Sequence, residues 1–269
     1  MIVSWRSWRS GSTADLLQIF GQAGEKLVVS GDPVAEKRAR ERLAASYSIR
    51  HRLELDGGGR TVLVIGAEDW PYPIPLVRRG SGWAFDVRAG EEQILDRRIG
   101  RDELDAIQTC RSYVEAQRDF AARTASGGRR VYAMKVESTP GRHDGLYWPA
   151  ASADTQSPLG PRVAAAEAKG YGVASREGLA PFQGYYYRIL TAQGPHAPGG
   201  EKSYIADGQM TGGFALVAYP AKWGDSGVMT FIVNQAGIVF EKNLGPDTAR
   251  LARRIEAFDP DRSWRIANP

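Results

Sequence analysis

Arg142-His143-Asp144-Gly145 is the polar stretch of the sequence best suited to acid–base chemistry. An imidazole exchanges protons near neutral pH, and a carboxylate beside it can orient the ring. Consecutive side chains diverge, however, so His143 and Asp144 could form a metal or acid–base site only with partners from elsewhere in the chain. The alternative is an ordinary Asp-Gly turn that leads into a strand over 146–148.

Gly224-Asp225-Ser226-Gly227 has the residue order of the nucleophile loop of chymotrypsin-like proteases. In that loop, main-chain N–H groups beside the serine bind the oxyanion. The motif is incomplete, because Val228 stands where another Gly is needed and His51 lies within an alternating strand pattern. We therefore interpret Ser226 as a turn residue between two strands.

Cys110, the one cysteine, could act as a nucleophile if a nearby cation or a helix N-terminus stabilised its thiolate. It belongs to a helical stripe of residues at three- and four-residue steps, and Arg111 is one position off that stripe. This phase predicts a buried, structural Cys110. The stripe consists of Leu104, Ile107, Cys110, Val114, Gln117 and Ala121.

Aromatic residues with proline neighbours form the candidate binding surface. In the segment 69–75, Trp70, Pro71, Tyr72 and Pro73 are held extended, because each proline fixes its own φ and biases the residue before it. This segment could rim an apolar pocket, present a rigid surface to a partner, or pack over the sheet. The same question arises for His143, Asp144, Tyr147, Trp148 and Tyr186, the other members of the candidate surface.

Length and composition describe an ordinary globular chain. Its 269 residues suffice for one large domain or two modest ones. The net charge of +4, from 35 basic and 31 acidic residues, is too small to indicate nucleic-acid binding. One cysteine excludes an internal disulfide and a cysteine-based zinc cage, and the three histidines lack the spacing of a helical metal motif. Gly57-Gly58-Gly59 lacks the Lys and Ser/Thr of a phosphate loop, so we expect no cofactor.

The N-terminus carries no visible export signal. Arg6 and Arg9 stand where a secretory apolar core belongs, and no run reaches the roughly 18–20 apolar residues of a membrane span. We expect residues 1–11 to be a disordered tail, or the product of a misplaced start that omits a real leader.

The first half, 12–99, is expected to be a helix-plus-sheet module. Helices are predicted over 14–21 and from Pro33 to Tyr47, the second with Asp32 as its cap. The strands predicted to follow are 49–55, 61–65, 74–77 and 83–87. Helices feeding a curved antiparallel sheet resemble the cone-shaped nuclear-transport-factor-like fold, which implies a pocket inside the cone.

The second half, 100–269, is expected to begin within a long helix over 89–123, with Gly100 as its weak point. Strands are predicted over 131–136, 185–191, 214–219, 228–233 and 238–242, and helices over 161–169 and 247–257. In the strand 185–191, Tyr185 and Tyr187 share one face and Tyr186 takes the other. A long helix leading an antiparallel sheet resembles a pilin or pseudopilin head. A pilin helix begins with an apolar half at the chain terminus, whereas this one is charged and lies mid-chain, so assembly into a pilus is not carried over from the resemblance.

Longer phrases carry a family resemblance. They include "SGDPVAEKRARERLAASY", "VLVIGAEDWPYPIPLVRRGSGWAFD", "STPGRHDGLYWPA" and "GGFALVAYPAKWGDSGVMTFIVN". The chain from about Leu27 to Pro260 resembles the bacterial domain-of-unknown-function family 2950. The resemblance implies an envelope-associated, periplasmic or lipid-anchored protein, and it brings no catalytic residues.

These observations together predict an α+β protein of two joined halves. We expect a non-catalytic interaction or scaffold module with an envelope protein as its partner and the proline-spaced aromatic segment as its contact surface. The alternative is a hydrolase or small-ligand-binding protein that uses a pocket in the first half or a site near His143 and Asp144.

Overall fold

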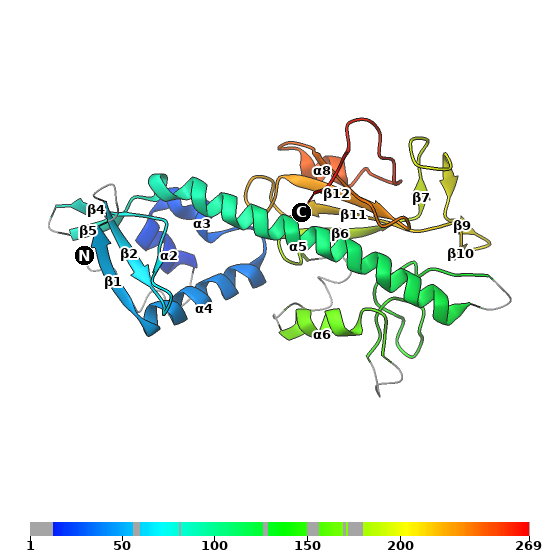
Figure 1. The fold of residues 1–269 in the computed structure, drawn as a ribbon, viewed down its shortest axis with the longest axis horizontal. Helices are drawn as coiled ribbons and strands as arrows, with labels where there is room; N and C mark the ends of the chain where they lie inside the picture. The colour runs from blue at the N-terminus through cyan, green and yellow to red at the C-terminus, as the bar shows by residue number, and fades with distance from the viewer. Residues whose placement is uncertain are drawn as a thin grey trace. The chain divides into compact units, whose positions relative to one another are not determined.

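The computed structural model describes residues 13–55, 60–80, 82–125, 129–149, 156–168, 171 and 180–268. It confirms the α+β class: helices and a small antiparallel sheet are followed by a long helix and a second antiparallel sheet (Figure 1). The chain divides into two compact units, Met1–Gly100 and Arg101–Pro269. The predicted tail 1–11 and the glycine turn 57–59 lie outside the described residues.

Unit 1 contains the helices and strands predicted for the first half, with small shifts of their ends. Its elements are α2 (Thr13–Phe20), η1 (Gln22–Gly24), α3 (Glu25–Val28), α4 (Pro33–Ile49), β1 (His51–Leu55), β2 (Thr61–Ile65), β3 (Trp70–Pro71), β4 (Leu76–Arg79), β5 (Gly82–Phe85) and the first part of α5 (Val87–Thr124). The strand predicted at 74–77 begins two residues later, because Pro75 has no N–H to donate to a ladder.

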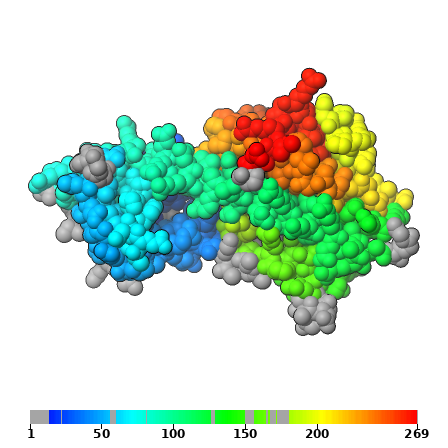
Figure 2. Space-filling model, viewed as in Figure 1, coloured from blue at the N-terminus to red at the C-terminus, as the bar shows by residue number. Residues whose placement is uncertain are grey.

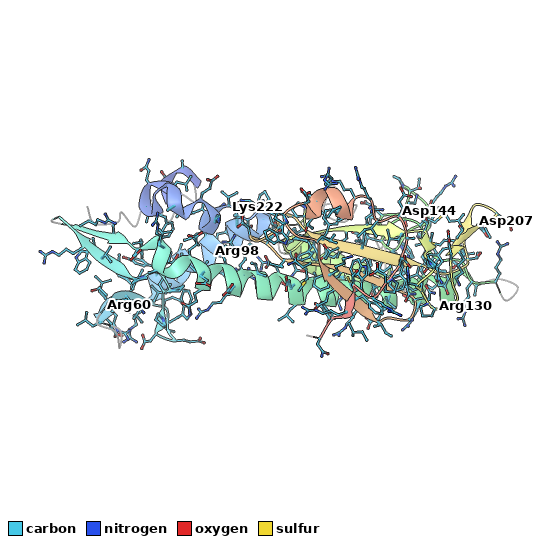
Figure 3. All side chains as sticks on the ribbon, turned by 90° about the horizontal axis from the view of Figure 1, so that it is seen from above. Arg60, Arg98, Arg130, Asp144, Asp207 and Lys222 are labelled. Atoms are coloured by element: carbon cyan, nitrogen blue, oxygen red, sulfur yellow. The ribbon has the colours of Figure 1, made fainter. Side chains whose placement is uncertain are left out.

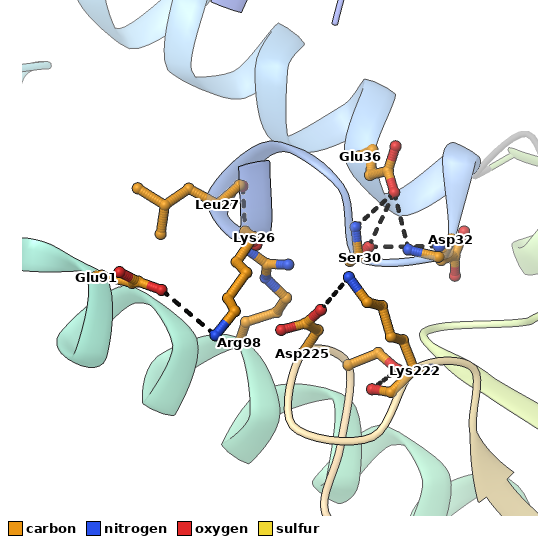
Figure 4. A network of polar contacts seen from close by, with 11 residues as sticks. Lys26, Leu27, Ser30, Asp32, Glu36, Glu91, Arg98, Lys222 and Asp225 are labelled. Atoms are coloured by element: carbon orange, nitrogen blue, oxygen red, sulfur yellow. Dashed lines mark hydrogen bonds and ion pairs between the residues drawn. The ribbon is translucent and has the colours of Figure 1, made fainter. Parts of the chain in front are cut away.

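The start of α4 is fixed by two acidic side chains. Asp32 caps the helix, since its carboxylate accepts hydrogen bonds from the N–H groups of Val34 and Ala35 at 3.1 and 3.0 Å. Glu36 reaches back from the first turn and accepts from the N–H groups of Ser30 and Gly31 at 2.7 and 3.1 Å (Figure 4). The main-chain donors that a helix start leaves without helical partners are thus bound locally.

The strands of unit 1 form one antiparallel sheet in the order β1-β2-β4-β5, with β3 paired to the end of β2. Its core joins one face of this sheet to α2 and α3, where Phe20 packs against Phe85 with ring centroids 5.3 Å apart. The Arg98 guanidinium of α5 donates to the carbonyl groups of Lys26 and Leu27 at the end of α3 (Figure 4). Local caps and one apolar face therefore hold this unit together.

Helix α5 runs unbroken through Gly100, so the predicted weak point does not divide it. The predicted stripe is buried except for Leu104, whose side chain is 52% exposed. At about 100° per residue, Leu104 lies roughly 100° around the helix from the mean direction of the other five. The inclusion of Leu104 in the stripe was wrong, because its helical phase points away from the buried face.

Unit 2 contains the remainder of α5 and the strands of the second half. Its other elements are α6 (Gly160–Ala168), β6 (Tyr185–Leu190), β7 (Ala192–Gln193), β8 (Lys202–Ser203), β9 (Ile205–Ala206), β10 (Gln209–Met210), β11 (Ala215–Pro220), β12 (Met229–Asn234), β13 (Val239–Asn243), α8 (Thr248–Ala252) and β14 (Arg265–Ile266). The main sheet has the order β14-β13-β12-β11-β6, and each described pairing is antiparallel.

The main sheet of unit 2 is covered on both faces. Helix α5 packs on the face that carries Tyr187 and Leu216, and its Tyr113 hydroxyl donates to the Ala215 carbonyl at 3.1 Å. On the other face, the Arg188 guanidinium donates to carbonyl groups of Ala252 and Ile255 at 3.0 and 2.7 Å, at the end of α8. This double cover explains why β11 is buried along its whole length.

Three predicted elements differ in the structure. The segment 146–148 is not a strand, because Tyr147 forms only an isolated bridge with Glu137. The segment 131–136 is not a strand: Tyr132 forms an isolated bridge with Met210, and Gln117 binds the main chain of Ala133. The helix predicted over 247–257 stops at Ala252. There the carbonyl groups bind Arg188 of β6, a contact from 64 positions away that no local pattern contains.

Candidate functional site

His143 and Asp144 do not form an acid–base pair. The His143 ring stacks on Trp148 at a centroid distance of 4.2 Å, whereas the Asp144 carboxylate accepts from the N–H and hydroxyl of Thr139 at 2.8 and 2.9 Å. Partial burial alone would raise the pKa of Asp144, but hydrogen bonds from Thr139 and Lys135 outweigh it and lower that pKa to about 2. Asp144, labelled in Figure 3, therefore closes a turn as a carboxylate.

Ser226 is bound within its own turn. Its hydroxyl accepts from the N–H of Lys222 at 3.0 Å and donates to the carbonyl of Lys222 at 3.2 Å, and the residue is fully buried. The turn joins β11 to β12, as the sequence predicts. A nucleophilic serine needs a free hydroxyl that faces a base, and this one faces the main chain.

Cys110 is fully buried on the inner side of α5. Burial raises the pKa of its thiol to about 12, and the nearby Arg111 offsets this only in part. Since the thiolate is the reactive form, a neutral thiol in the core is inert near neutral pH. The arrangement matches a structural cysteine.

The proline-spaced aromatic segment is split between surface and core. Trp70 is 40% exposed and Pro71 is exposed, but Tyr72 is only 8% exposed and packs against Phe85 at 5.7 Å. The prediction that Tyr72 belongs to an exposed contact surface was wrong. The cause is strand pairing, because Tyr72 donates its N–H to the Leu63 carbonyl and its ring enters the core.

The other aromatic candidates are also engaged. Trp148 is buried beneath His143, and Tyr147 is half-buried in a bridge to Glu137. Tyr186 is half-buried beside Tyr219, with ring centroids 5.5 Å apart. Each of these aromatic candidates of unit 2 therefore already has a packing partner or a main-chain partner.

A different surface gathers exposed apolar and cationic side chains, at one end of the unit 1 sheet. Thr61 is paired with Leu55 of β1 and with Leu76 of β4, so the hairpin turns that follow Leu55 and Arg79 lie at the same end. We call this end the sheet tip. It consists of Leu55, Arg60, Arg78, Arg79 and Trp83.

Three side chains of the sheet tip share one face. Residues directly opposite in an antiparallel pair point the same way, and residues two positions apart repeat that direction. Leu55 thus lies on the face of Leu76 and Phe85, and the pair Arg78 and Trp83 lies two positions farther out. The inner residues belong to the core, whereas Leu55 is 74% and Trp83 44% exposed.

The charge of the sheet tip is positive among its described residues. Arg78 and Arg79 are exposed and have no ion pair with a described residue, and Arg60, labelled in Figure 3, directly precedes β2 at the same end. By contrast, Arg50 and Arg52 farther along the sheet are both paired with Asp69. Asp56 follows Leu55 in the chain and lies outside the described residues.

Sequence reasoning missed the sheet tip, although one signal was present. Leu53 and Leu55 alternate with Arg52 and Glu54, which predicts a half-buried strand. In the structure both leucines are at least half exposed. The exposure of Leu53 and Leu55 depends on how much of the unit 1 sheet the described helices cover, and local alternation of residues does not contain this information.

The described residues hold no other obvious chemical centre. Among them, no three His, Cys, Asp or Glu side chains gather as a metal site would require. His196 pairs with Asp259 at 3.0 Å on the surface, across 63 positions of sequence, and this pair was also missed. No described helix combines the length and apolar character that crossing a membrane demands.

Comparison with known proteins adds one finding. No curated protein and no solved structure matches the chain. The resemblances to a cone fold and to a pilin head therefore stay predictions from pattern. Residues 6–267 match the family described as Protein of unknown function (DUF2950), which confirms the resemblance seen in the sequence. The chain belongs to this family.

Proposed function

We propose that this protein is a non-catalytic interaction module of the bacterial cell envelope, and that its sheet tip rests on an anionic membrane surface. The observation that carries the proposal is the exposure of Leu55 and Trp83 on one face with Arg78 between them. Indole and aliphatic side chains enter the interface of a bilayer, and arginine binds lipid phosphate. The envelope location is part of this proposal, and its support is the family resemblance, which implies an envelope-associated protein.

The candidate catalytic groups support binding over catalysis. The hydroxyl of Ser226 is used in its turn, the Cys110 thiol is neutral and buried, and Asp144 is bound to Thr139. Each of these groups already has a structural partner or environment. The hydrolase alternative has no comparable observation in its favour.

An anionic membrane is preferred over a protein partner because of the cations at the sheet tip. An arginine near an anionic bilayer contributes about 1 kcal/mol of binding free energy. Two arginines, Arg78 and Arg79, would therefore contribute about 2 kcal/mol, or roughly a 30-fold change in partition coefficient. This attraction decreases as salt shortens the Debye length.

The test is co-sedimentation with vesicles of phosphatidylglycerol and phosphatidylcholine, compared with phosphatidylcholine alone. We expect binding to the anionic vesicles only, weaker at high salt. The double variant R78Q/R79Q should lose about 30-fold in partition coefficient, and Trp83→Ala should also bind more weakly. The matched control is R253Q/R254Q, an exposed adjacent pair in unit 2.

Two results would overturn the proposal. One is the absence of binding to either vesicle type. The other is equal binding by R78Q/R79Q and the control, which would show that cations elsewhere are responsible. A specific cross-link from the sheet tip to an envelope protein, without vesicle binding, would replace the membrane by a protein partner.

A further inference from the structure

A cavity of about 180 Å³ lies in unit 2 between α5, α6 and the face of the main sheet. The surfaces of α5 and α6 adjoin there, green and yellow-green in Figure 2. The lining is mainly apolar, with aromatic rings on several sides. Its apolar members include Tyr113, Leu159, Val163, Phe182, Tyr187 and Leu216.

The size of this cavity suits one ring-sized molecule. A cavity of about 150 Å³ in a protein core stays dry and can hold benzene. The volume here would therefore accept one aromatic ring with a small substituent. The rings of Tyr113, Phe182 and Tyr187 can contact such a ring in edge-on or offset geometry, which aromatic pairs prefer.

Two polar groups of the lining are available to a ligand, and both are donors. The Tyr187 hydroxyl is buried and faces the Thr109 hydroxyl, but it has no partner at hydrogen-bond geometry among the described residues. Burial raises the pKa of Tyr187 well above its ordinary value, so this hydroxyl keeps its proton. Arg162 is exposed and has no ion pair or hydrogen bond with a described residue.

The remaining polar groups of the lining are already engaged. The Thr109 hydroxyl donates to the Asp105 carbonyl at 2.8 Å, and that of Ser112 donates to the Gln108 carbonyl at 2.7 Å. The Gln183 amide donates to the Asp105 carboxylate at 2.8 Å. A buried donor without an acceptor is costly, so a ligand that supplies an acceptor to Tyr187 gains that free energy on binding.

We infer that this cavity binds a small aromatic carboxylic acid, with its ring among the aromatic side chains and its carboxylate accepting from Tyr187 and Arg162. An apolar cavity with a few placed polar groups is the usual form of a small-molecule site. Arginine binds a carboxylate through charge-assisted and often bidentate hydrogen bonds. The inference concerns unit 2 and does not depend on the sheet tip.

Phenylacetate is the probe, measured by isothermal titration calorimetry with the full chain. It should bind saturably with one site and raise the Tm. Benzylamine has a similar ring but a positive charge, and acetate has the carboxylate without the ring. We expect both to bind at least tenfold more weakly than phenylacetate.

Three variants locate the site. Tyr187→Phe keeps the ring and removes the donor, and Arg162→Gln removes the charge, so each should weaken phenylacetate binding about tenfold or more. Arg130→Gln, an exposed arginine elsewhere in unit 2, is the matched control and should bind as the parent does. An unchanged far-UV spectrum and Tm of each unliganded variant show that it is folded.

The inference fails if phenylacetate gives no saturable binding. It also fails if benzylamine binds equally well, or if Tyr187→Phe and Arg162→Gln both retain the affinity of the control. In the last case the acid binds elsewhere. Each of these results is independent of vesicle binding.

Discussion

Gln117 and Ala133 bind each other as residues of neighbouring strands do, although Gln117 belongs to a helix. Its side-chain amide donates to the Ala133 carbonyl at 2.7 Å and accepts from the Ala133 N–H at 2.9 Å. Both residues are buried, and the same amide also donates to the Tyr113 hydroxyl at 3.0 Å. The Gln117 side chain thus supplies the hydrogen bonds that a neighbouring strand would otherwise make with the main chain of Ala133.

Replacing Gln117 by Leu should destabilise the protein by about 2–6 kcal/mol, because two buried main-chain groups would lose their partners at roughly 1–3 kcal/mol each. Urea unfolding measures this loss. The control is Gln108→Leu, an exposed position of the same helix, which should change the free energy of unfolding by less than about 0.5 kcal/mol. Equal effects at the two positions would show that the paired hydrogen bonds contribute little.

Trp70 and Tyr72 should respond very differently to truncation. Tyr72→Ala empties a buried aromatic site beside Phe85 and should cost roughly 3–5 kcal/mol of stability. Trp70 is 40% exposed, so Trp70→Ala should cost clearly less, about 1 kcal/mol. Thermal unfolding of the two variants measures the difference. A larger loss at Trp70 would contradict the placement of these rings.

Cys110 should be unreactive in the folded protein. A thiol reagent at roughly pH 8, near the ordinary thiol pKa, should label Cys110 only after denaturant is added. Because the folded pKa is raised from 9.0 to about 12, the unfolded chain loses this proton first as the pH rises. The contribution of Cys110 to stability is therefore complete below about pH 9 and is lost toward pH 12. Fast labelling of the native chain would contradict this assignment.

Asp32→Ala should shorten or loosen the start of α4. The substitution removes two capping hydrogen bonds from a fully buried carboxylate and should cost about 1–2 kcal/mol. Glu41→Ala, at an exposed position of the same helix, is the control and should be nearly neutral. Thermal unfolding followed by far-UV circular dichroism measures both. A Tm equal to that of the control would mean that water replaces the cap.

The parts of the fold that local chemistry decides were predictable from the sequence. Asp32 followed by Pro33 marks a helix start, and β2 follows directly from the β-branched run at 61–65. The segment around Ala133 was mistaken for a strand because its pattern is apolar. Its hydrogen bonds go to a side chain 16 positions away, which no local pattern shows.

The candidate sites were less predictable, because both depend on pairing between distant segments. Leu55 and Trp83 share a face only through the registers of three strand pairs, and each register could shift without changing the local pattern. The cavity beside Tyr187 requires α5, α6 and two strands together. The alternation of side chains in 185–187 predicted which face of the strand Tyr187 occupies, but it did not predict the cavity beside Tyr187.

Helix α5 also sets the order in which this chain can fold during synthesis. The Tyr113–Ala215 hydrogen bond spans 102 positions, and ribosomes add about 5–20 residues per second. The apolar stripe of Ile107, Cys110 and Val114 is therefore complete some 5–20 seconds before β11 emerges to cover it. Throughout that interval the nascent chain exposes the apolar face of α5. The yield of folded protein in cells should therefore depend on chaperones that bind exposed apolar surface until the strands of the sheet have been synthesised.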